Sequence, residues 1–285
     1  MTLALSPAAP GEASLDLAAG QTGADRTALA LRDLREAAGL WRLCWTLAWL
    51  DIRLRYRGSV LGPFWLTLST AVMVGALGFV YSTLFGMNLA DYMAFLALSL
   101  VLWNFLGTLV GDACMGFTSA ETTIRSMRMP YTLYAARIVV RNILILAHNV
   151  VVIVAVDLIL WFWPGQAALL ALPGLALWLL DSMAISVLLG ALCARFRDIP
   201  PIVANIMQMA FFVSAVIWKP SQLHENEWML AYNPFYTLLE VVRGPLLGEV
   251  PSTSVYVSAL AFSAALCVLS WVLFVRVRGR IAFWV

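Results

Sequence analysis

Long apolar stretches separated by short polar segments make up most of the chain. No charged residue occurs between Arg57 and Asp91, and similar stretches follow further along. A helix needs roughly 20 apolar residues to cross a hydrocarbon core about 30 Å thick. The pattern therefore predicts an all-α integral membrane protein with six transmembrane helices. These spans are predicted at about residues 62–85, 92–114, 138–162, 167–193, 200–218 and 252–275.

The segment before the first span has helical periodicity instead of a continuous apolar run. Its apolar positions are Leu31, Leu34, Ala38, Trp41, Trp45, Ala48 and Ile52, and the opposite side carries Arg32, Arg35, Arg42 and Arg53. An amphipathic helix rich in Trp and Arg is typical of a segment lying in the membrane interface. We therefore expect residues 26–57 to form a cytoplasmic interface helix. The alternative is a helix packed on a soluble domain, but the sequence leaves no such domain.

The first 25 residues differ from everything that follows. They contain no basic residue and no long apolar core, as a secretory signal would require. We expect residues 1–25 to form a disordered cytoplasmic tail.

Residues 219–250 are long for a loop and too apolar for exposure to solvent. Asn233 and Pro234 are typical of a helix start, because Asn caps the first turn and Pro fits within it. The following helix reaches only to Gly244 and Pro245, which is too short to cross a membrane. We predict a re-entrant or outer helical hairpin, and a loop packed across the bundle remains the alternative.

Composition supports the membrane assignment, and the distribution of charge gives an orientation. The chain is 62% hydrophobic and 12% charged, whereas soluble domains contain about 25% charged residues. Lys219 is the single lysine among 18 basic residues, and it shares its predicted side with Arg243 alone. Every other basic residue outside the predicted spans falls on the opposite side. The positive-inside rule therefore places both termini in the cytoplasm.

Several chemistries lack the residues that they need. A nucleotide-binding P-loop requires Gly-Lys followed by Ser or Thr, whereas Lys219 lies between Trp218 and Pro220. The four cysteines and two histidines show no metal-ligand spacing, and there is no G-x-S-x-G or H-E-x-x-H motif. We expect no metal site and no cofactor in this chain. Any ATP and Mg²⁺ would be bound by another subunit.

Five motifs in register resemble the permease subunits of type-2 ABC exporters, and more narrowly those that export bacterial polysaccharides such as O-antigen. They are RLRYRGSVLGPFW (53–65), RMPYTLYAARIVVRN (128–142), ARFRDIPPIV (194–203), NPFYTLLEVVRGPLLG (233–248) and RVRGRIAFWV (276–285). The resemblance covers about residues 40–285. It implies a homodimer in the bacterial inner membrane, with a separate ATPase on the cytoplasmic face and a lipid-linked polysaccharide as substrate. Membrane lipids are the other expected partners, and no nucleic acid is expected.

Two other functions stay open from the residues. One is a drug or small-lipid exporter of the same superfamily, which a closed pocket would favour over a wide channel. The other is a multi-span glycan-modifying enzyme, which would need a cluster of acids or histidines that the sequence does not show.

The sequence suggests four groups of functional residues. Arg53, Arg55 and Arg57 are candidates to bind the substrate headgroup, since Arg donates paired hydrogen bonds to phosphate; membrane lipids could equally be their partners. Glu121, Arg125, Arg128, Arg195, Arg197 and Asp198 are candidates for coupling to the ATPase. Candidate channel-lining rings are Tyr81, Phe85, Trp103, Phe105, Phe211, Phe212 and Trp218. Asn233, Pro234, Phe235 and Arg243 are expected at an outer gate.

Overall fold

The computed structural model describes residues 22–58, 64–161, 163 and 165–285, and over these ranges it is helical with no β-strand. The α-helices are α1 (Gly23–Gly39), α2 (Trp41–Arg55), α3 (Phe64–Phe85), α4 (Leu89–Cys114), α5 (Glu121–Ser126), α6 (Tyr131–Leu160), α7 (Ala171–Arg195), α8 (Ile199–Val213), α9 (Pro234–Leu246), α10 (Thr253–Val277) and α11 (Ile281–Trp284). The 3₁₀ segments are η1 (Thr118–Ala120), η2 (Gln166–Leu170), η3 (Pro220–Tyr232) and η4 (Arg278–Arg280). The predicted all-α class is confirmed. The predicted tail at 1–25 lies outside the described residues except for its last four.

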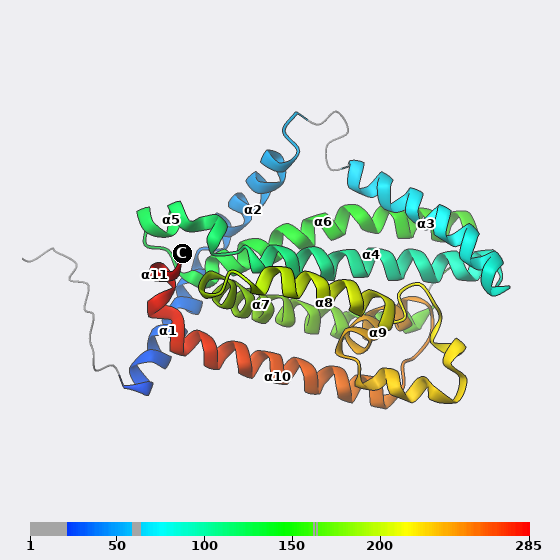
Figure 1. The fold of residues 1–285 in the computed structure, drawn as a ribbon. Coiled ribbons are helices and arrows are strands. Elements are labelled where there is room, and N and C mark those ends of the chain that lie inside the picture. The colour runs from blue at the N-terminus through cyan, green and yellow to red at the C-terminus, as the bar shows by residue number, and fades with distance from the viewer. Residues whose placement is uncertain (1–21, 59–63, 162, 164) are drawn as a thin grey trace, which may run out of the picture.

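Five helices in the described part of the chain are long and apolar enough to cross a membrane. They are Thr67–Phe85, Leu89–Cys114, Tyr131–Leu160, Gln166–Arg195 and Thr253–Trp284. They form an elongated bundle, with α1, α5 and α11 at one end and α9 toward the other (Figure 1). We call these the α5 end and the α9 end.

The structure differs from the prediction at the fifth span, which was expected at 200–218. Helix α8 has 15 residues and is therefore about 22 Å long, short of the roughly 30 Å that a straight span needs. Its continuation is diverted because Arg243 Nη1 donates to the Ala215 carbonyl at 2.7 Å. The Tyr92 hydroxyl donates to the Ile217 carbonyl at 2.5 Å. These carbonyls are bound by side chains of other helices, so the chain turns after Val213.

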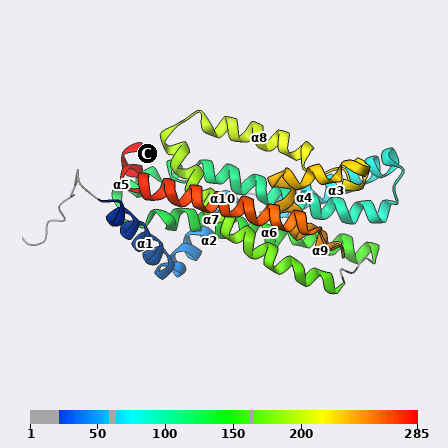
Figure 2. The same cartoon turned by 90° about the horizontal axis from the view of Figure 1, so that it is seen from below.

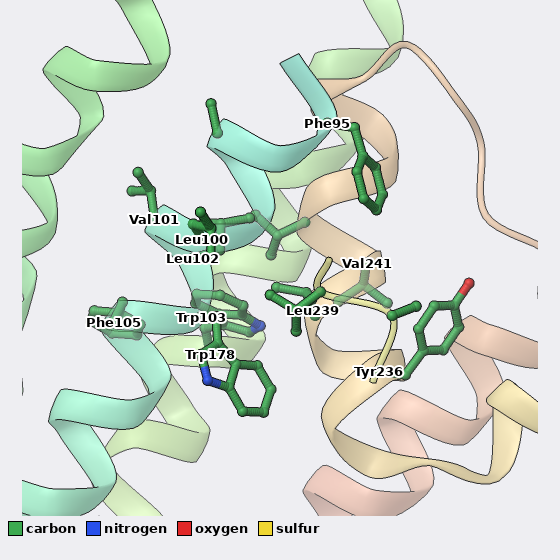
Figure 3. Packing of buried hydrophobic residues seen from close by; sticks show 14 of the residues in the cluster. Phe95, Leu100, Val101, Leu102, Trp103, Phe105, Trp178, Tyr236, Leu239 and Val241 are labelled. Atoms are coloured by element: carbon green, nitrogen blue, oxygen red, sulfur yellow. The ribbon is translucent and has the colours of Figure 1, made fainter. Parts of the chain in front are cut away.

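Helix α4 is the centre of the bundle, lying between α6 and α7 (Figures 1 and 2). Every residue from Phe95 to Trp103 is buried, so this part of α4 is packed on all sides. Figure 3 shows Trp103 beside Trp178 of α7 and Leu239 of α9 in one apolar cluster. A helix buried all round belongs to the core of a large bundle.

Helices α7 and α9 approach each other closely at Gly174. A Cβ at this position would lie 2.7 Å from the Val241 carbonyl oxygen, so only glycine fits without moving α9. The Trp178 indole, one turn further along α7, donates to the Leu238 carbonyl at 2.7 Å. These contacts fix α9 against the bundle.

The predicted single helix at 26–57 is two helices, which meet at Leu40 between α1 and α2. The buried face consists mainly of small residues, including Ala30, Ala37, Cys44 and Ala48. Burial raises the pKa of the Cys44 thiol, which packs as a small apolar side chain. Much of the expected apolar face is exposed on both helices, including Leu31 and Leu34 of α1 and Trp41 and Trp45 of α2.

Arg243 of α9 is completely buried near the α9 end. Its Nε donates to Glu240 at 3.0 Å, and its Nη1 donates to the Ser99 hydroxyl at 2.9 Å. The guanidinium also lies 4.6 Å from the centre of the Phe95 ring. One side chain therefore joins α9, α4 and the turn after α8.

We expect Arg243→Met to destabilise the protein by about 3–5 kcal/mol, because it leaves the Glu240 carboxylate buried without its cation. The measurement is the temperature at which the buried Cys114 and Cys193 thiols become reactive to a maleimide dye in detergent. Arg128→Met is the control, since Arg128 is exposed, and should change stability by less than about 0.5 kcal/mol. Equal unfolding temperatures for the two variants would contradict the assigned role of Arg243.

Candidate functional site

Five charged side chains from α2, α4 and α6 surround a cavity of about 360 Å³ near the α5 end. We call this the ionic pocket; its charged residues are Asp51, Arg55, Asp112, Arg137 and Arg141. Three arginines face two aspartates, so the pocket has a formal charge of +1. Such a group between apolar helices is costly unless paired, and intramembrane charges commonly mark a functional site.

The two aspartates are held by different sets of donors. Asp51 accepts from Arg137 Nε at 2.6 Å and from Arg141 Nη1 at 3.3 Å. Asp112 accepts from Arg141 Nη2 at 2.8 Å and from Arg55 at 3.3 Å. Arg141 therefore bridges both carboxylates and connects α2 with α4 through α6.

Spacing on each helix explains why these side chains meet. Asp51 and Arg55 are four residues apart on α2, as are Arg137 and Arg141 on α6, so each pair lies on one face of its helix. Gly116 follows α4 at the edge of the pocket, where a Cβ would lie 2.7 Å from Ile138 Cδ1. A larger residue there would require the Ile138 side chain to move.

The pocket has hydrogen-bond donors that lack acceptors. Within the described residues, the Tyr134 hydroxyl and Arg141 Nε are buried without a hydrogen-bond partner. Tyr134 is only 4% exposed and lines the cavity. Unpaired buried donors cost about 1–3 kcal/mol each, so they call for a ligand or water. Together with the net positive charge, they suit an anion with several acceptor oxygens.

Asp33 of α1 anchors the same region without lining the cavity. It is fully buried and accepts from the backbone N–H groups of Tyr131 and Thr132 at 3.1 and 3.0 Å. It thus caps α6 from a distant part of the chain, where a carboxylate also favours the positive end of the helix dipole. Arg278 Nε donates to the same carboxylate at 3.0 Å, which adds the end of α10.

Comparison with known proteins identifies the family. The model of the ABC-2 type transporter family matches residues 42–247, which is well over half of the chain. The chain belongs to the ABC-2 type transporter family.

Three curated relatives are all O-antigen export system permease proteins RfbA. The one from Myxococcus xanthus is 23% identical over 212 residues, which cover 73% of this chain and 82% of the relative. Two from Klebsiella pneumoniae are each 20% identical, and cover 66% and 81% of this chain and 74% and 90% of the relatives. These relatives confirm the resemblance that the five motifs suggested.

The three arginines of the first motif have separate positions in this ABC-2 protein. Arg55 reaches the ionic pocket, whereas Arg53 lies over the Trp49 ring at 5.8 Å. Arg57 is exposed in the turn after α2. Residues 59–63 of the motif lie outside the described part of the chain. The motif therefore indicates one pocket residue, and Asp51 and Arg137 were not predicted.

Two of the candidate coupling elements contact the C-terminal segment. Arg125 of α5 forms an ion pair with Glu121 at 2.8 Å and donates to the Val285 carbonyl at 2.5 Å. Arg195, at the end of α7, lies over the Trp284 ring at 5.7 Å. The C-terminal segment thus joins α5 to the α7–α8 turn.

The remaining candidate coupling residues, Arg128, Arg197 and Asp198, are exposed. Arg197 and Asp198 form the turn between α7 and α8, immediately after Arg195. Their exposure leaves them available to another protein, and their coupling role stays a prediction.

Two of the candidate channel rings are buried within the chain. Trp103 is 5.8 Å from the Phe211 ring, and Phe105 stacks on Trp178 at 5.4 Å. Trp103 and Phe105 are each less than 10% exposed. Packing within the chain occupies both rings, so they stabilise the bundle in this structure.

The other candidate rings are more accessible. Tyr81 and Phe85 stack at 5.5 Å on α3, and Phe212 of α8 is 59% exposed. The Trp218 indole donates to the Phe212 carbonyl at 2.8 Å, in the turn after α8. The channel-lining role remains a prediction for these residues and for the half-buried Phe211.

The candidate outer-gate residues hold the α9 segment in place. Asn233 Oδ1 accepts from Phe235 N and Tyr236 N at 3.0 and 3.2 Å, which confirms the predicted cap. Pro234 occupies the first turn of α9, and the Phe235 ring lies 6.1 Å from that of Trp103. With Arg243 buried beneath them, these residues provide a fixed base for this segment.

We expect a double-mutant cycle of Asp51→Ala and Arg137→Ala to give a coupling energy of about 1–2 kcal/mol. The Asp51–Arg137 pair is only partly buried, so solvent screening makes its coupling energy smaller than that of a fully buried charge-assisted hydrogen bond. The measurement is the free energy of unfolding from a denaturant titration in detergent.

The exposed pair Arg32–Glu36 provides the control cycle, with an expected coupling of about 0.3–0.5 kcal/mol. If the coupling energy of the Asp51–Arg137 pair were no larger than that of the control pair, this ion pair would not stabilise the contact between α2 and α6.

Proposed function

We propose that this chain is the permease subunit of an ATP-driven exporter for a lipid-linked, O-antigen-like polysaccharide. The ionic pocket carries the proposal, because it offers the chemistry that a phosphate group on such a lipid requires. The names of the three relatives support the same class of substrate.

Phosphate recognition follows from the side chains of the pocket. Arg55, Arg137 and Arg141 supply planar guanidinium groups, which match phosphate oxygens in pairs. The Tyr134 hydroxyl and Arg141 Nε supply two further donors that the chain does not satisfy. In this proposal the phosphate takes these donors and competes with Asp51 and Asp112 for the arginines.

The proposed membrane arrangement has six crossings and both termini in the cytoplasm. Helix α8 is the fifth crossing in chain order and is added to the five long helices; its 15 residues are completed by the turn that Arg243 and Tyr92 hold. Helices α1 and α2 lie in the cytoplasmic interface; exposed Trp41, Trp45 and Trp49 of α2 and exposed Leu31 and Leu34 of α1 support this placement. Residues 219–250, with η3 and α9, form the outer segment of the bacterial inner-membrane protein.

The α5 end is the proposed docking surface for a separate ATPase subunit. Exposed Arg128, Arg197 and Asp198 supply polar contacts there, and the C-terminal segment connects α5 to the α7–α8 turn. The exporter contains two copies of the chain, and the exposed α8 face with Phe212 is the proposed side that meets the second copy.

Phosphate recognition is tested with the full chain in lipid nanodiscs. Arg141→Gln should weaken binding of a polyprenyl pyrophosphate by about tenfold or more, since it removes a charge-assisted contact. Arg35→Gln, at an exposed position of α1 outside the pocket, should change binding little, and neither variant should alter the weak binding of the uncharged polyprenol. Equal effects of the two substitutions would count against the pocket as the phosphate site.

Docking is tested by co-purification with an ABC-type ATPase from the same genome. Arg197→Glu reverses an exposed charge on the α7–α8 turn and should reduce the recovered ATPase several-fold. Glu225→Arg, also exposed but in η3 on the outer segment, is the matched control. Undiminished recovery with Arg197→Glu, or an equal loss with Glu225→Arg, would remove the turn from the docking surface.

A further inference from the structure

A second cavity, of about 250 Å³, lies between α3, α4 and α6. Its polar lining residues are Ser69, Thr70, Asn104, Thr108 and Asn149. We call it the amide cavity. None of these side chains is ionisable, so its chemistry differs from that of the ionic pocket.

The amide cavity lies further along α4 and α6, two of the helices that form the ionic pocket. On α4, Thr108 and Asn104 lie one and two turns from Asp112, on the same face. On α6, Asn149 lies eight residues beyond Arg141. Eight residues rise about 12 Å along either helix, and the two helices run in opposite directions, so both shifts lead toward the α9 end.

The lining offers hydrogen bonds to a neutral polar ligand. Asn149 is only 3% exposed, and its Oδ1 accepts from the Thr67 hydroxyl at 3.2 Å, which fixes the orientation of the amide. The Asn104 side chain is half-buried and makes no hydrogen bond within the described residues. An amide presents both a donor and an acceptor, which suits the paired hydroxyl groups of a sugar.

Size and walls agree with this chemistry. An apolar cavity of about 150 Å³ accepts benzene, so 250 Å³ has room for a six-membered ring with substituents. Phe105 lies in the wall beside the polar groups and provides an apolar surface for ring C–H groups.

We propose that the amide cavity binds one glycosyl unit of the lipid-linked substrate, through its hydroxyl or acetamido groups, while the ionic pocket binds the phosphate. This inference rests on the proposed function and adds to it a contact with sugar. The uncharged amides of Asn104 and Asn149 bind the sugar. The cavity therefore accepts uncharged sugars, and binding of the sugar there does not require a phosphate group.

The test compares two lipids on the full chain in nanodiscs: polyprenyl pyrophosphate, and the same lipid carrying one N-acetylhexosamine. Asn104→Leu should weaken binding of the glycosylated lipid by about tenfold and leave that of the bare lipid unchanged. Asn149→Leu should act in the same direction. Arg141→Gln should weaken both lipids. Ser270→Ala is the matched control, since Ser270 is a buried polar residue that bonds the Ala184 carbonyl away from the cavity.

Each outcome separates the two proposals. If Asn104→Leu weakened both lipids equally, or neither, the amide cavity would not bind sugar, although the phosphate site would stand if Arg141→Gln still acted. If the wild-type chain bound neither lipid, the proposed function and this inference would both be overturned. A loss with Ser270→Ala equal to that with Asn104→Leu would show a general effect of removing buried polar groups.

Discussion

The arrangement depends on one constraint: a charge placed between apolar helices must find its partners there, because packed side chains and hydrocarbon do not solvate it. Among the described residues, ion pairs meet this constraint in two separate layers, whereas the buried Asp181 of α7 accepts from the Ser263 hydroxyl alone, at 2.7 Å. Near the α5 end, Arg141 bridges Asp51 and Asp112. Near the α9 end, Arg243 bonds Glu240 and Ser99. Helix α4 contributes to both layers, and its apolar middle forms the core between them, so each layer fixes one end of the bundle.

The sequence predicts the long helices because their length and hydropathy are local properties, and α3, α4, α6, α7 and α10 fall close to the expected spans. Helix α8 differs for a reason that no local pattern contains. Its stop depends on Tyr92 and Arg243, which lie more than 100 residues before and nearly 30 residues after the turn they bind. The break at Leu40 was not predicted, because the helical periodicity of the sequence continues through it. The division into α1 and α2 is visible only in the folded chain, where both helices pack against α6.

The candidate site was predictable in parts only. The motif at 53–65 points to Arg55, and the position of Arg141 and Asp112 within or beside apolar spans marks them as unusual. Their pairing is a product of tertiary packing: Asp51 and Arg137 are 86 residues apart, and nothing near either one indicates the other. Asp33 carries still less signal, since acids interspersed with arginines on an amphipathic helix have the pattern of a solvated face, yet Asp33 is fully buried as the cap of α6.

The contacts that hold α2 explain how a substrate that binds in the ionic pocket could also move this helix. The apolar contact of α2 with the bundle is limited to its three buried residues, Cys44, Ala48 and Ile52. The ion pairs of Asp51 and Arg55 also join it to α6 and α4. An anion does not compete for apolar contacts, but a phosphate can replace a carboxylate on arginine because it has the same charge sign and also accepts paired hydrogen bonds. In the proposed mechanism, a phosphate in the ionic pocket therefore exchanges contacts that fix α2 for contacts that fix the substrate. The energy of binding is then partly used to loosen α2, without breaking the apolar core that keeps α4 and α6 together.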